Sequence, residues 1–470
     1  MINRRNLGKS LLALPLLGTS SRAAAALDLK AVSRSIEVNG KAASVFGLVG
    51  PDGKPGLSLA ADALHEVMLT NTLTQDTLIH WHGLTPQWAF DGVPDMPKPL
   101  LKPAESRSYQ LPGGRSGTHW MHAHTLQEQN LLAAPLIVRS KDDLARDEQE
   151  IVVLLHDFSF TPAEELLKSL GAGGGMTHGA MDHSKMAGGM KMGDGMMMGG
   201  GMMGMDVNDI TYDAYLANDR TLADPEVHAV EKGGRVRLRI INGATSTAFT
   251  LDTGALEAQV VAVDGQDVQP LLMRLVPLAM GQRVDLILTI PKEGGAFPVL
   301  ALREGAVERT GFILATAGAA VSKLAGTSEA QGPLLDLAIE ARLVSLRPLA
   351  EAAVARRFTV MLHGTMQPYV WAMMTDRDLR VAQGERVEVE MQNHSMMTHP
   401  MHLHGHHFEI VAINGQRMKG AVRDTVVVPP MNSVTFGFDA NNPGGGWAFH
   451  CHHLYHMATG MMSSIAYEGA

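Results

Sequence analysis

The stretch Phe449-His450-Cys451-His452-His453-Leu454-Tyr455-His456, followed by Met461, holds the only cysteine among 470 residues. A single thiol cannot form an intramolecular disulfide, so Cys451 is a buried apolar residue, a nucleophile or a metal ligand. His456 follows it by five residues and Met461 by ten. Thiolate, imidazole and a weak axial thioether are the ligands of blue-copper electron-transfer sites, whereas zinc has no use for a thioether.

The neighbours of Cys451 indicate how this stretch folds. Alternate side chains of an extended strand share a face, so Cys451 would point one way and His450 and His452 the other. One strand could therefore hold two different metal sites back to back, with a short covalent path between them.

The whole chain is consistent with several domains. Its length predicts two to four, and 45% apolar residues suffice for several cores. The formal net charge is -9 and no basic stripe is present, which argues against a nucleic-acid partner.

Short alternating apolar and polar runs, broken by Gly and Pro, predict a β-rich fold. A weak repeat supports this prediction, because Asn71, Asn242 and Asn393 each end an alternating run. Three copies about 150–170 residues apart suggest three similar β domains. We place them at residues 27–145, 146–320 and 321–470.

The first 26 residues have the pattern of an export signal. Arg4 and Arg5 precede the apolar residues 11–17, and Ala23–Ala26 offer small residues for cleavage. The arginine pair resembles a twin-arginine signal, which exports folded proteins, and predicts a periplasmic location. A Sec leader or a disordered tail is the alternative. No segment is long and apolar enough to span a membrane.

Residues 171–205 interrupt the β pattern with a low-complexity insert of Gly, Met, His and Lys. It is either a flexible insertion without further role or a loop that captures Cu(I), because soft thioethers select Cu(I). The candidate contacts in this insert are Met176, Met181, His183 and Met186.

Four His-x-His pairs occur in the chain, and each would place two imidazoles on one face of a strand. One such pair could be a surface feature or a fragment of a zinc site. Eight imidazoles suit three coppers with two, three and three ligands, and His399 joins Cys451, His456 and Met461 at a fourth. The pairs are His80/His82, His122/His124, His402/His404 and His450/His452.

These segments resemble the four copper signatures of multicopper oxidases, and the similarity covers nearly the whole chain. The signatures are His80-Trp81-His82-Gly83, the run from Gly117 to His124, the run from His399 to Gly405, and His450-Cys451-His452 through Met461. The resemblance implies an all-β chain of three cupredoxin-like Greek-key β-sandwich domains and four copper ions.

The resemblance also implies a role for each ligand. One type 1 copper would be held by His399, Cys451, His456 and Met461, and one type 2 copper by His80 and His402. Two type 3 coppers would be held by His82, His122, His124, His404, His450 and His452. Asp91 resembles the acid that assists proton delivery, although it could be only a turn residue before Gly92. Met457 stands where many relatives have an acid, and Ser395 where some copper-oxidising relatives have Asp.

The expected function is that of an exported oxidase. It would take single electrons from phenols, aromatic amines or Cu(I) at the type 1 copper and reduce O2 to water at the other three. Met396 and Met397, beside His399, are candidate Cu(I) contacts, and with the insert they favour a role in copper tolerance. A monomer is expected. The alternative is a copper-sequestering protein whose Met-rich insert is the main functional part.

Overall fold

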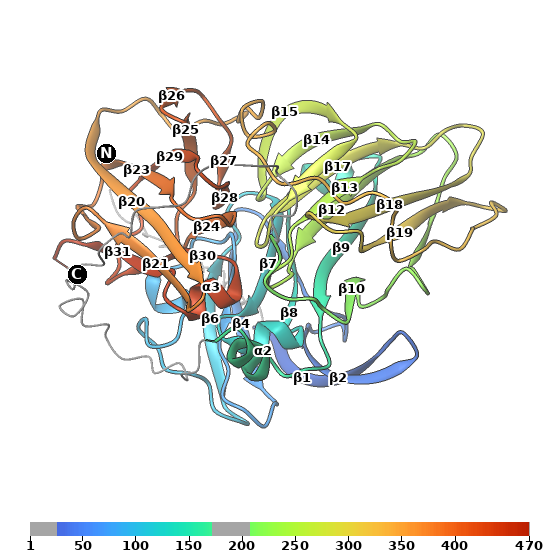
Figure 1. Cartoon of the computed structure of the whole chain (residues 1–470), viewed down its shortest axis with the longest axis horizontal. Helices are drawn as coiled ribbons and strands as arrows, with labels where there is room; N and C mark the ends of the chain where they lie inside the picture. Colours follow the sequence, from blue (N-terminus) through green and yellow to red (C-terminus); the bar gives the residue numbers. More distant parts are fainter. Residues whose placement is uncertain (1–25, 172–206, 470) are drawn as a thin grey trace, which may run out of the picture.

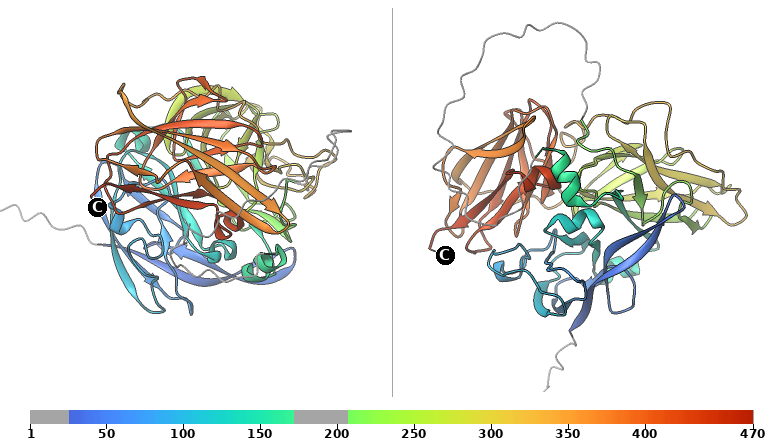
Figure 2. Two further views of the ribbon diagram at one scale, coloured as in Figure 1. Left: turned by 60° about the vertical axis from the view of Figure 1, so that its left-hand side comes forward. Right: turned by 60° about the horizontal axis from the view of Figure 1, so that its bottom comes forward.

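The structure, a computed structural model, describes residues 26–171 and 207–469, and it is almost entirely β. Its strands form six sheets. Two sheets come from each third of the chain, so three β-sandwiches follow one another, coloured from blue to red in Figure 1 and seen from two other sides in Figure 2.

The first sandwich has sheets of strand order β2-β1-β4-β6 and β3-β8-β7-β5. Its strands are β1 (Leu27–Val38), β2 (Lys41–Val49), β3 (Leu57–Ala60), β4 (Leu64–Asn71), β5 (Ile79–His80), β6 (Ser106–Pro112), β7 (Gly117–Ala123) and β8 (Ala133–Arg139).

The second sandwich has sheets of order β10-β9-β12-β17-β14-β15 and β11-β19-β18-β13-β16. Its strands are β9 (Gln149–Phe158), β10 (Ala214–Ala217), β11 (Val227–Val230), β12 (Arg235–Asn242), β13 (Phe249–Asp252), β14 (Ala258–Val263), β15 (Gln266–Met273), β16 (Leu275–Leu278), β17 (Arg283–Thr289), β18 (Ala296–Arg303) and β19 (Arg309–Thr316).

The third sandwich has sheets of order β21-β20-β23-β29-β25-β26, with β27 beside β25, and β22-β31-β30-β24-β28. Its strands are β20 (Val354–Met366), β21 (Tyr369–Thr375), β22 (Arg380–Val381), β23 (Arg386–Asn393), β24 (His399–Leu403), β25 (Phe408–Ile413), β26 (Gln416–Arg417), β27 (Val422–Arg423), β28 (Thr425–Val428), β29 (Ser433–Asp439), β30 (Trp447–Cys451) and β31 (Met462–Tyr467).

Helices are short in the described part of the chain. They are η1 (Trp88–Phe90), η2 (Leu126–Asn130), α1 (Lys141–Ala145), α2 (Ala163–Ser169) and α3 (Leu454–Ala458). None of these helices has the length and apolar character needed to cross a membrane.

The three repeated asparagines perform the same task in each sandwich. Asn242 is buried; its side-chain amide donates to the backbone carbonyls of Thr247 and Leu278, and its Oδ1 accepts from the Ala244 amide. Asn71 and Asn393 make the corresponding bonds, each with two carbonyls and one amide. Each asparagine therefore closes the loop that follows a central strand.

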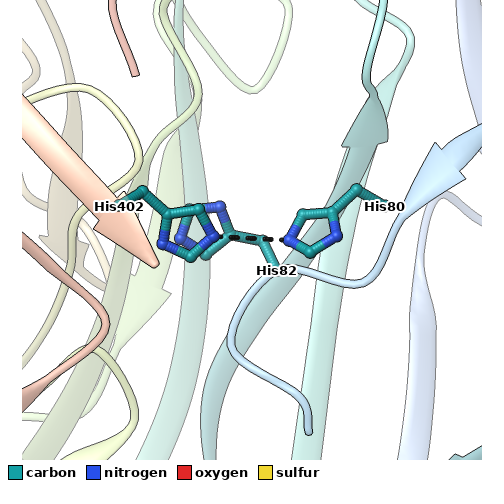
Figure 3. A group of neighbouring side chains, drawn as sticks. All are labelled: His80, His82 and His402. Carbon is teal, nitrogen blue, oxygen red and sulfur yellow. Dashed lines mark hydrogen bonds between the residues drawn. The ribbon is translucent and has the colours of Figure 1, made fainter. Parts of the chain in front are cut away.

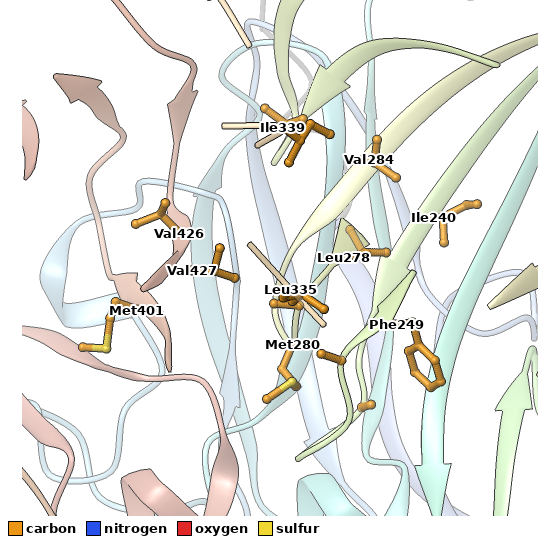
Figure 4. Close-up of a cluster of buried hydrophobic side chains, with 14 of the residues drawn as sticks. Ile240, Phe249, Leu278, Met280, Val284, Leu335, Ile339, Met401, Val426 and Val427 are labelled. Atoms are coloured by element: carbon orange, nitrogen blue, oxygen red, sulfur yellow. The ribbon is translucent and has the colours of Figure 1, made fainter. Parts of the chain in front are cut away.

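The second and third sandwiches share one apolar core. Met280 and Leu335 on one side belong to the same buried cluster as Met401 and Val427 on the other, as Figure 4 shows. The first sandwich has its own core cluster, which contains Leu69 and Trp81. Burial of this continuous apolar surface favours a fixed arrangement of the second and third sandwiches.

The connection between β19 and β20 contributes to this shared core through Leu335 and Ile339. It is attached to β18 by a hydrogen bond of 2.7 Å from the Leu335 amide to the Glu304 carboxyl. Glu304 is 6% exposed, and burial raises its pKa to about 7. The carboxyl is therefore easier to keep protonated in the folded chain than in the unfolded chain.

Glu304 should make the stability depend on pH. In the unfolded chain its pKa returns to about 4.5, so the unfolded state ionises first and stability falls as the pH rises from about 4.5 to 7. Glu304→Gln keeps an acceptor for Leu335 and should remove this decline, worth up to about 3 kcal/mol at pH 8. Urea unfolding at pH 5 and pH 8 measures the effect. Glu293→Gln at an exposed position is the control, and equal pH slopes for the parent and the Glu304→Gln protein would contradict the expectation.

Candidate metal centres

Cys451 lies in a buried cluster with the two histidines assigned to it from the sequence. Its Sγ is 3.7 Å from Nδ1 of His399 and 3.7 Å from Nδ1 of His456, and the two nitrogens are 3.2 Å apart. All three side chains have no exposed surface. The centre of such a triangle lies about 2 Å from each corner, which is the length of bonds from first-row metals to nitrogen and sulfur.

The fourth predicted member of this cluster, Met461, is also completely buried. The Met461 amide donates to the carbonyl of His456, and the Cys451 amide donates to the carbonyl of Met461. The end of β30 and α3 are thus tied together around the cluster. The donors, one thiol and two imidazoles with a buried thioether close in the chain, fit copper better than zinc.

The structure brings together all eight imidazoles of the His-x-His pairs. Their nitrogens form three buried groups whose members lie within 4.8 Å of one another: His80, His82 and His402; His82, His122 and His452; and His124, His404 and His450. Apart from the second appearance of His82, this grouping matches the two, three and three ligands expected from the sequence.

Strand register explains why these side chains meet. His402 on β24 lies opposite His450 on β30, and His80 on β5 lies opposite His122 on β7. The pairs of the first and third sandwiches face each other: Nε2 of His80 and Nε2 of His402 are 3.4 Å apart, as Figure 3 shows. The cluster therefore lies between the first and third sandwiches.

Backbone carbonyls orient several of the rings. Nδ1 of His80 donates to the carbonyl of Asp91 at 3.0 Å, and Nδ1 of His402 to the carbonyl of Asp424 at 2.8 Å. Nδ1 of His450 donates to the carbonyl of Cys451 at 2.9 Å. These bonds leave Nε2 of each ring unprotonated and directed into the cluster, which is how surrounding groups prepare a metal-binding histidine.

Electrostatics favour the metal-binding form of these rings. Burial lowers the pKa of His82, His122 and His404 well below the usual range, and the neighbouring imidazoles lower it further. Burial also lowers the pKa of His450, to about 4. Metal ions bind neutral imidazole, so the cluster can accept copper at neutral pH with little competition from protons.

Comparison with known proteins identifies the family. Three sequence models, each described as "Multicopper oxidase", match residues 33–143, 150–319 and 351–469 in succession.

The chain belongs to the multicopper oxidase family.

Relatives and solved structures agree with this membership. Multicopper oxidase MmcO of Mycobacterium tuberculosis is 29% identical, with 88% of this chain and 81% of the relative aligned. Copper resistance protein A of Escherichia coli is 26% identical over 85% of both chains. The structure of Fet3p, described as a multicopper oxidase that functions in iron import, has a TM-score of 0.75 at 17% identity, covering 94% of this chain and 90% of that one. The predicted fold of three cupredoxin-like domains is confirmed.

The multicopper oxidase family implies copper as the cofactor, and the two clusters contain suitable donors. We name the two clusters after the copper ions that the sequence predicts for them: the type 1 cluster is Cys451, His399, His456 and Met461, and the trinuclear cluster is the eight imidazoles. Cys451 belongs to the first, while its neighbours His450 and His452 belong to the second. Successive side chains at the end of β30 therefore point alternately to the two clusters, as the sequence predicted.

Asp91 lies at the trinuclear cluster rather than on an exposed turn. It is 1% exposed, and its Oδ2 accepts from Nδ1 of His404 at 2.9 Å. Its Oδ1 is 3.4 Å from Nδ1 of His80 and makes no hydrogen bond within the described structure. A carboxylate between two ligand histidines can orient both rings and hold a proton close to the cluster.

Asp91→Asn should lower kcat for oxygen reduction by about 10- to 100-fold, because the amide can accept a hydrogen bond but cannot take up a proton. The absorption of the type 1 cluster and its rate of reduction under argon should not change. Oxygen uptake and stopped-flow absorption measure the two quantities. Asp95→Asn, on an exposed turn, is the matched control. A loss of the type 1 absorption in Asp91→Asn would contradict a role confined to the trinuclear cluster.

The trinuclear cluster contains acids that sequence reasoning missed. Oε2 of Glu128, on η2, accepts from Nδ1 of His122 at 3.1 Å, and Oε1 is 4.0 Å from Nδ1 of His452. Burial and the nearby Asp157 raise the pKa of Glu128 well above the usual range. A buried carboxyl group is thus present at the cluster. The sequence offers no local pattern that would single out Glu128.

A second missed group connects all three sandwiches. Asp424 accepts from Nε2 of His82 at 3.1 Å, so Nδ1 of His82 is the nitrogen that faces the cluster. The guanidinium of Arg283 pairs with both carboxylate oxygens of Asp424 at 2.6 Å and donates to the carbonyl of Thr118 at 3.2 Å. The second sandwich, which contains no His-x-His pair, therefore supports the cluster through Arg283.

The type 1 cluster also has an acid that the sequence did not reveal. Oδ2 of Asp209 accepts from Nε2 of His456 at 3.1 Å and from the hydroxyl of Tyr369. His453 stacks on His456 with ring centroids 3.7 Å apart. Nothing in the sequence spacing of His453 distinguishes it from an ordinary buried residue. Asp209 stands four residues after the end of the insert, and no sequence pattern pointed to it.

The predicted substrate contacts are only partly visible. Met396 is 60% exposed, whereas Met397 is buried and belongs to the shared core. Ser395 donates to Oδ1 of Asn393, and its Oγ accepts from Nε2 of His399 at 2.6 Å, so it orients this ligand. Met176, Met181, His183 and Met186 lie outside the described residues.

Proposed function

We propose that the protein oxidises Cu(I), phenols and aromatic amines one electron at a time at the type 1 cluster and reduces O2 to water at the trinuclear cluster. The observation that carries this proposal is the position of Cys451. Its thiol lies in one cluster, and the residues on either side of it lie in the other. Electrons can therefore pass between the clusters through a few covalent bonds.

The proposed reaction uses one type 1, one type 2 and two type 3 coppers. Bound copper would collect single electrons and deliver four of them to O2, which also takes up four protons. The chain's own contribution is to orient the imidazoles through Asp424 and the backbone carbonyls, and to hold protons at Asp91 and Glu128. Complete burial of the trinuclear cluster keeps bulk water from it.

Two observations support Cu(I) among the substrates and a role in copper tolerance. An exposed thioether, Met396, stands three residues before His399, and thioethers select Cu(I). The name of one relative also refers to copper resistance. Residues 1–26 lie almost entirely outside the described residues, and their pattern supports export to the periplasm as part of this proposal.

Oxygen uptake by the purified, copper-loaded protein tests the proposal, with Cu(I) and then a dimethoxyphenol as the electron donor. Copper content and the blue thiolate absorption are recorded on the same sample. We expect four coppers for each chain and faster uptake with Cu(I). Absence of uptake with either donor from a blue, four-copper protein would refute the oxidase and favour sequestration.

The insert of residues 171–205 separates the oxidase from the copper-sequestering alternative. Its deletion should lower the rate of Cu(I) oxidation while phenol oxidation stays the same or rises, because a Cu(I)-capturing loop has no affinity for phenols. Steady-state oxygen uptake of the full and deleted chains measures both rates. If the deleted chain binds fewer Cu(I) ions beyond the four proposed coppers yet oxidises Cu(I) at an unchanged rate, the insert serves storage rather than catalysis.

A further inference from the structure

Exposed methionines are concentrated on the third sandwich. Among the large apolar side chains that are exposed in residues 26–171 and 207–469, the methionines are Met366, Met374, Met396 and Met431, and all four belong to this sandwich. Methionine normally fills gaps in apolar cores. Thioethers gathered in solvent therefore call for an explanation other than packing.

Two histidines are close to these methionines in the chain, since His363 stands three residues before Met366 and His394 two before Met396. The rings of His363 and His394 stack with centroids 5.0 Å apart and an angle of 12° between their planes. Their strands, β20 and β23, are parallel neighbours, and the His394 amide donates to the carbonyl of Leu362. Neither ring contributes to the type 1 or trinuclear cluster, and His394 is exposed.

Register places thioethers on the same face as these rings. Met361, two residues before His363, is paired with Met374 on β21, and side chains two apart on a strand share a face. Met431 donates its amide to the carbonyl of Asn393, directly before His394. Cross-strand neighbours and diagonal neighbours lie within reach of long side chains such as methionine.

We propose that His363 and His394, with thioethers from Met361, Met374 or Met431, form a surface site for a soft monovalent metal ion. Cu(I) and Ag(I) prefer imidazole and thioether ligands, whereas hard divalent cations require oxygen ligands. Burial and the adjacent His394 lower the pKa of His363, so its ring is neutral and free to bind a cation at neutral pH.

The position of this site relates it to the type 1 cluster. His394 is followed by Ser395, whose Oγ accepts from Nε2 of His399 at 2.6 Å. The other ligand ring, His456, is completely buried. Its ring centroid is 3.7 Å from that of Trp371, and its Nε2 donates a hydrogen bond to Asp209. A soft ion bound at His394 would therefore be separated from His399 by one peptide unit and one hydrogen bond.

This inference deepens the proposed function, because it names where the Cu(I) substrate binds. Each Cu(I) ion gives up one electron through His394, Ser395 and His399 and leaves as Cu(II). Four such ions, four protons and one O2 yield two water molecules, so the electrons and protons balance. Phenols do not use this site, since they offer no soft cation to the imidazoles and thioethers.

A silver titration of the full, copper-loaded chain tests the site, because Ag(I) has the ligand preference of Cu(I) and is not oxidised. His363→Gln should bind one equivalent of Ag(I) fewer than the parent protein. The insert is present in both proteins, so any Ag(I) that it binds does not change this difference. The KM for Cu(I) should rise by about 10-fold or more, which is the size of effect expected when a metal site loses one of the groups that support it. Oxidation of dimethoxyphenol and the blue absorption should not change.

Two variants complete the test. His65→Gln, on the first sandwich, is the matched control and should bind as much Ag(I) as the parent. Met374→Leu should weaken Ag(I) binding without changing the fold. Equal Ag(I) binding by the parent and His363→Gln would overturn the site, and an unchanged KM for Cu(I) would overturn its role in substrate binding. If the parent binds the extra Ag(I) but oxidises no Cu(I), the site stands and the proposed substrate is wrong.

Discussion

Arg283→Met should lower the free energy of unfolding of the copper-free protein by about 3–5 kcal/mol. Arg283 has no exposed surface, and its guanidinium pairs with both oxygens of the buried Asp424. The carboxylate left behind would be a buried charge without the cation that pairs with it, which costs far more than the loss of a surface ion pair. The carbonyl of Thr118 would also lose its donor.

The same substitution should weaken copper binding at the trinuclear cluster by about 10- to 100-fold. Asp424 is the group that accepts from Nε2 of His82 and thereby directs Nδ1 of that ring into the cluster. Without Arg283 the carboxylate is free to take up a proton or turn away, and the ring loses its fixed tautomer. The type 1 cluster should keep its absorption, because none of its ligands contacts Asp424.

Urea unfolding of the copper-free protein and copper content after dialysis measure the two effects. Arg34→Met is the matched control, because Arg34 also makes a bidentate pair, with Asp219, but both side chains are about 26–31% exposed. That loss should cost about 1 kcal/mol or less. Equal destabilisation by the two substitutions would show that burial of the Arg283 pair does not matter.

Cys451→Ser should abolish the blue absorption and reduce the oxidation of every external donor by more than about 100-fold. Changing a group that only supports a metal ligand already costs up to about 100-fold, so the loss of a ligand itself should cost more. Cys451 is the only thiol in the chain, and no other residue can supply a thiolate to His399 and His456. The alcohol of serine remains protonated at neutral pH and is a poor ligand for copper.

The trinuclear cluster should survive this substitution, so three of the four proposed coppers remain. Copper analysis, visible absorption and oxygen uptake with a dimethoxyphenol give the three readouts. Met461→Leu is the control, because it removes a thioether and keeps the thiolate, so the blue absorption should persist. An intense blue band in Cys451→Ser would rule out the assignment of Cys451 as the type 1 ligand.

Much of the candidate site could be predicted because its pattern is local. His-x-His pairs place two rings on one face of a strand whatever the rest of the fold does, and Cys451 with His456 and Met461 is a compact ligand set. The repeated asparagines were visible as ends of alternating runs. Their bonds to carbonyls some 30–36 residues away, such as Leu101 for Asn71 and Leu278 for Asn242, depend on the folded sheet.

The supporting groups could not be predicted for the same physical reason. Asp424 lies 342 residues from His82, and Arg283 lies 141 residues from Asp424. No spacing rule connects such residues, because only the packing of three sandwiches brings them together. Glu128 and Asp209 are single acids among many, and their burial beside histidines appears only in three dimensions.

The trinuclear cluster combines residues from both ends of the chain, since β5 provides His80 and the end of β30 provides His450, with His452 two residues later. A chain that is still being synthesised has made the first half of this cluster long before the ribosome reaches the second. The complete set of ligands therefore exists only when translation is nearly finished. A premature stop codon just before β30 would leave both clusters incomplete at once, even though almost all of the three-sandwich architecture would already have been translated.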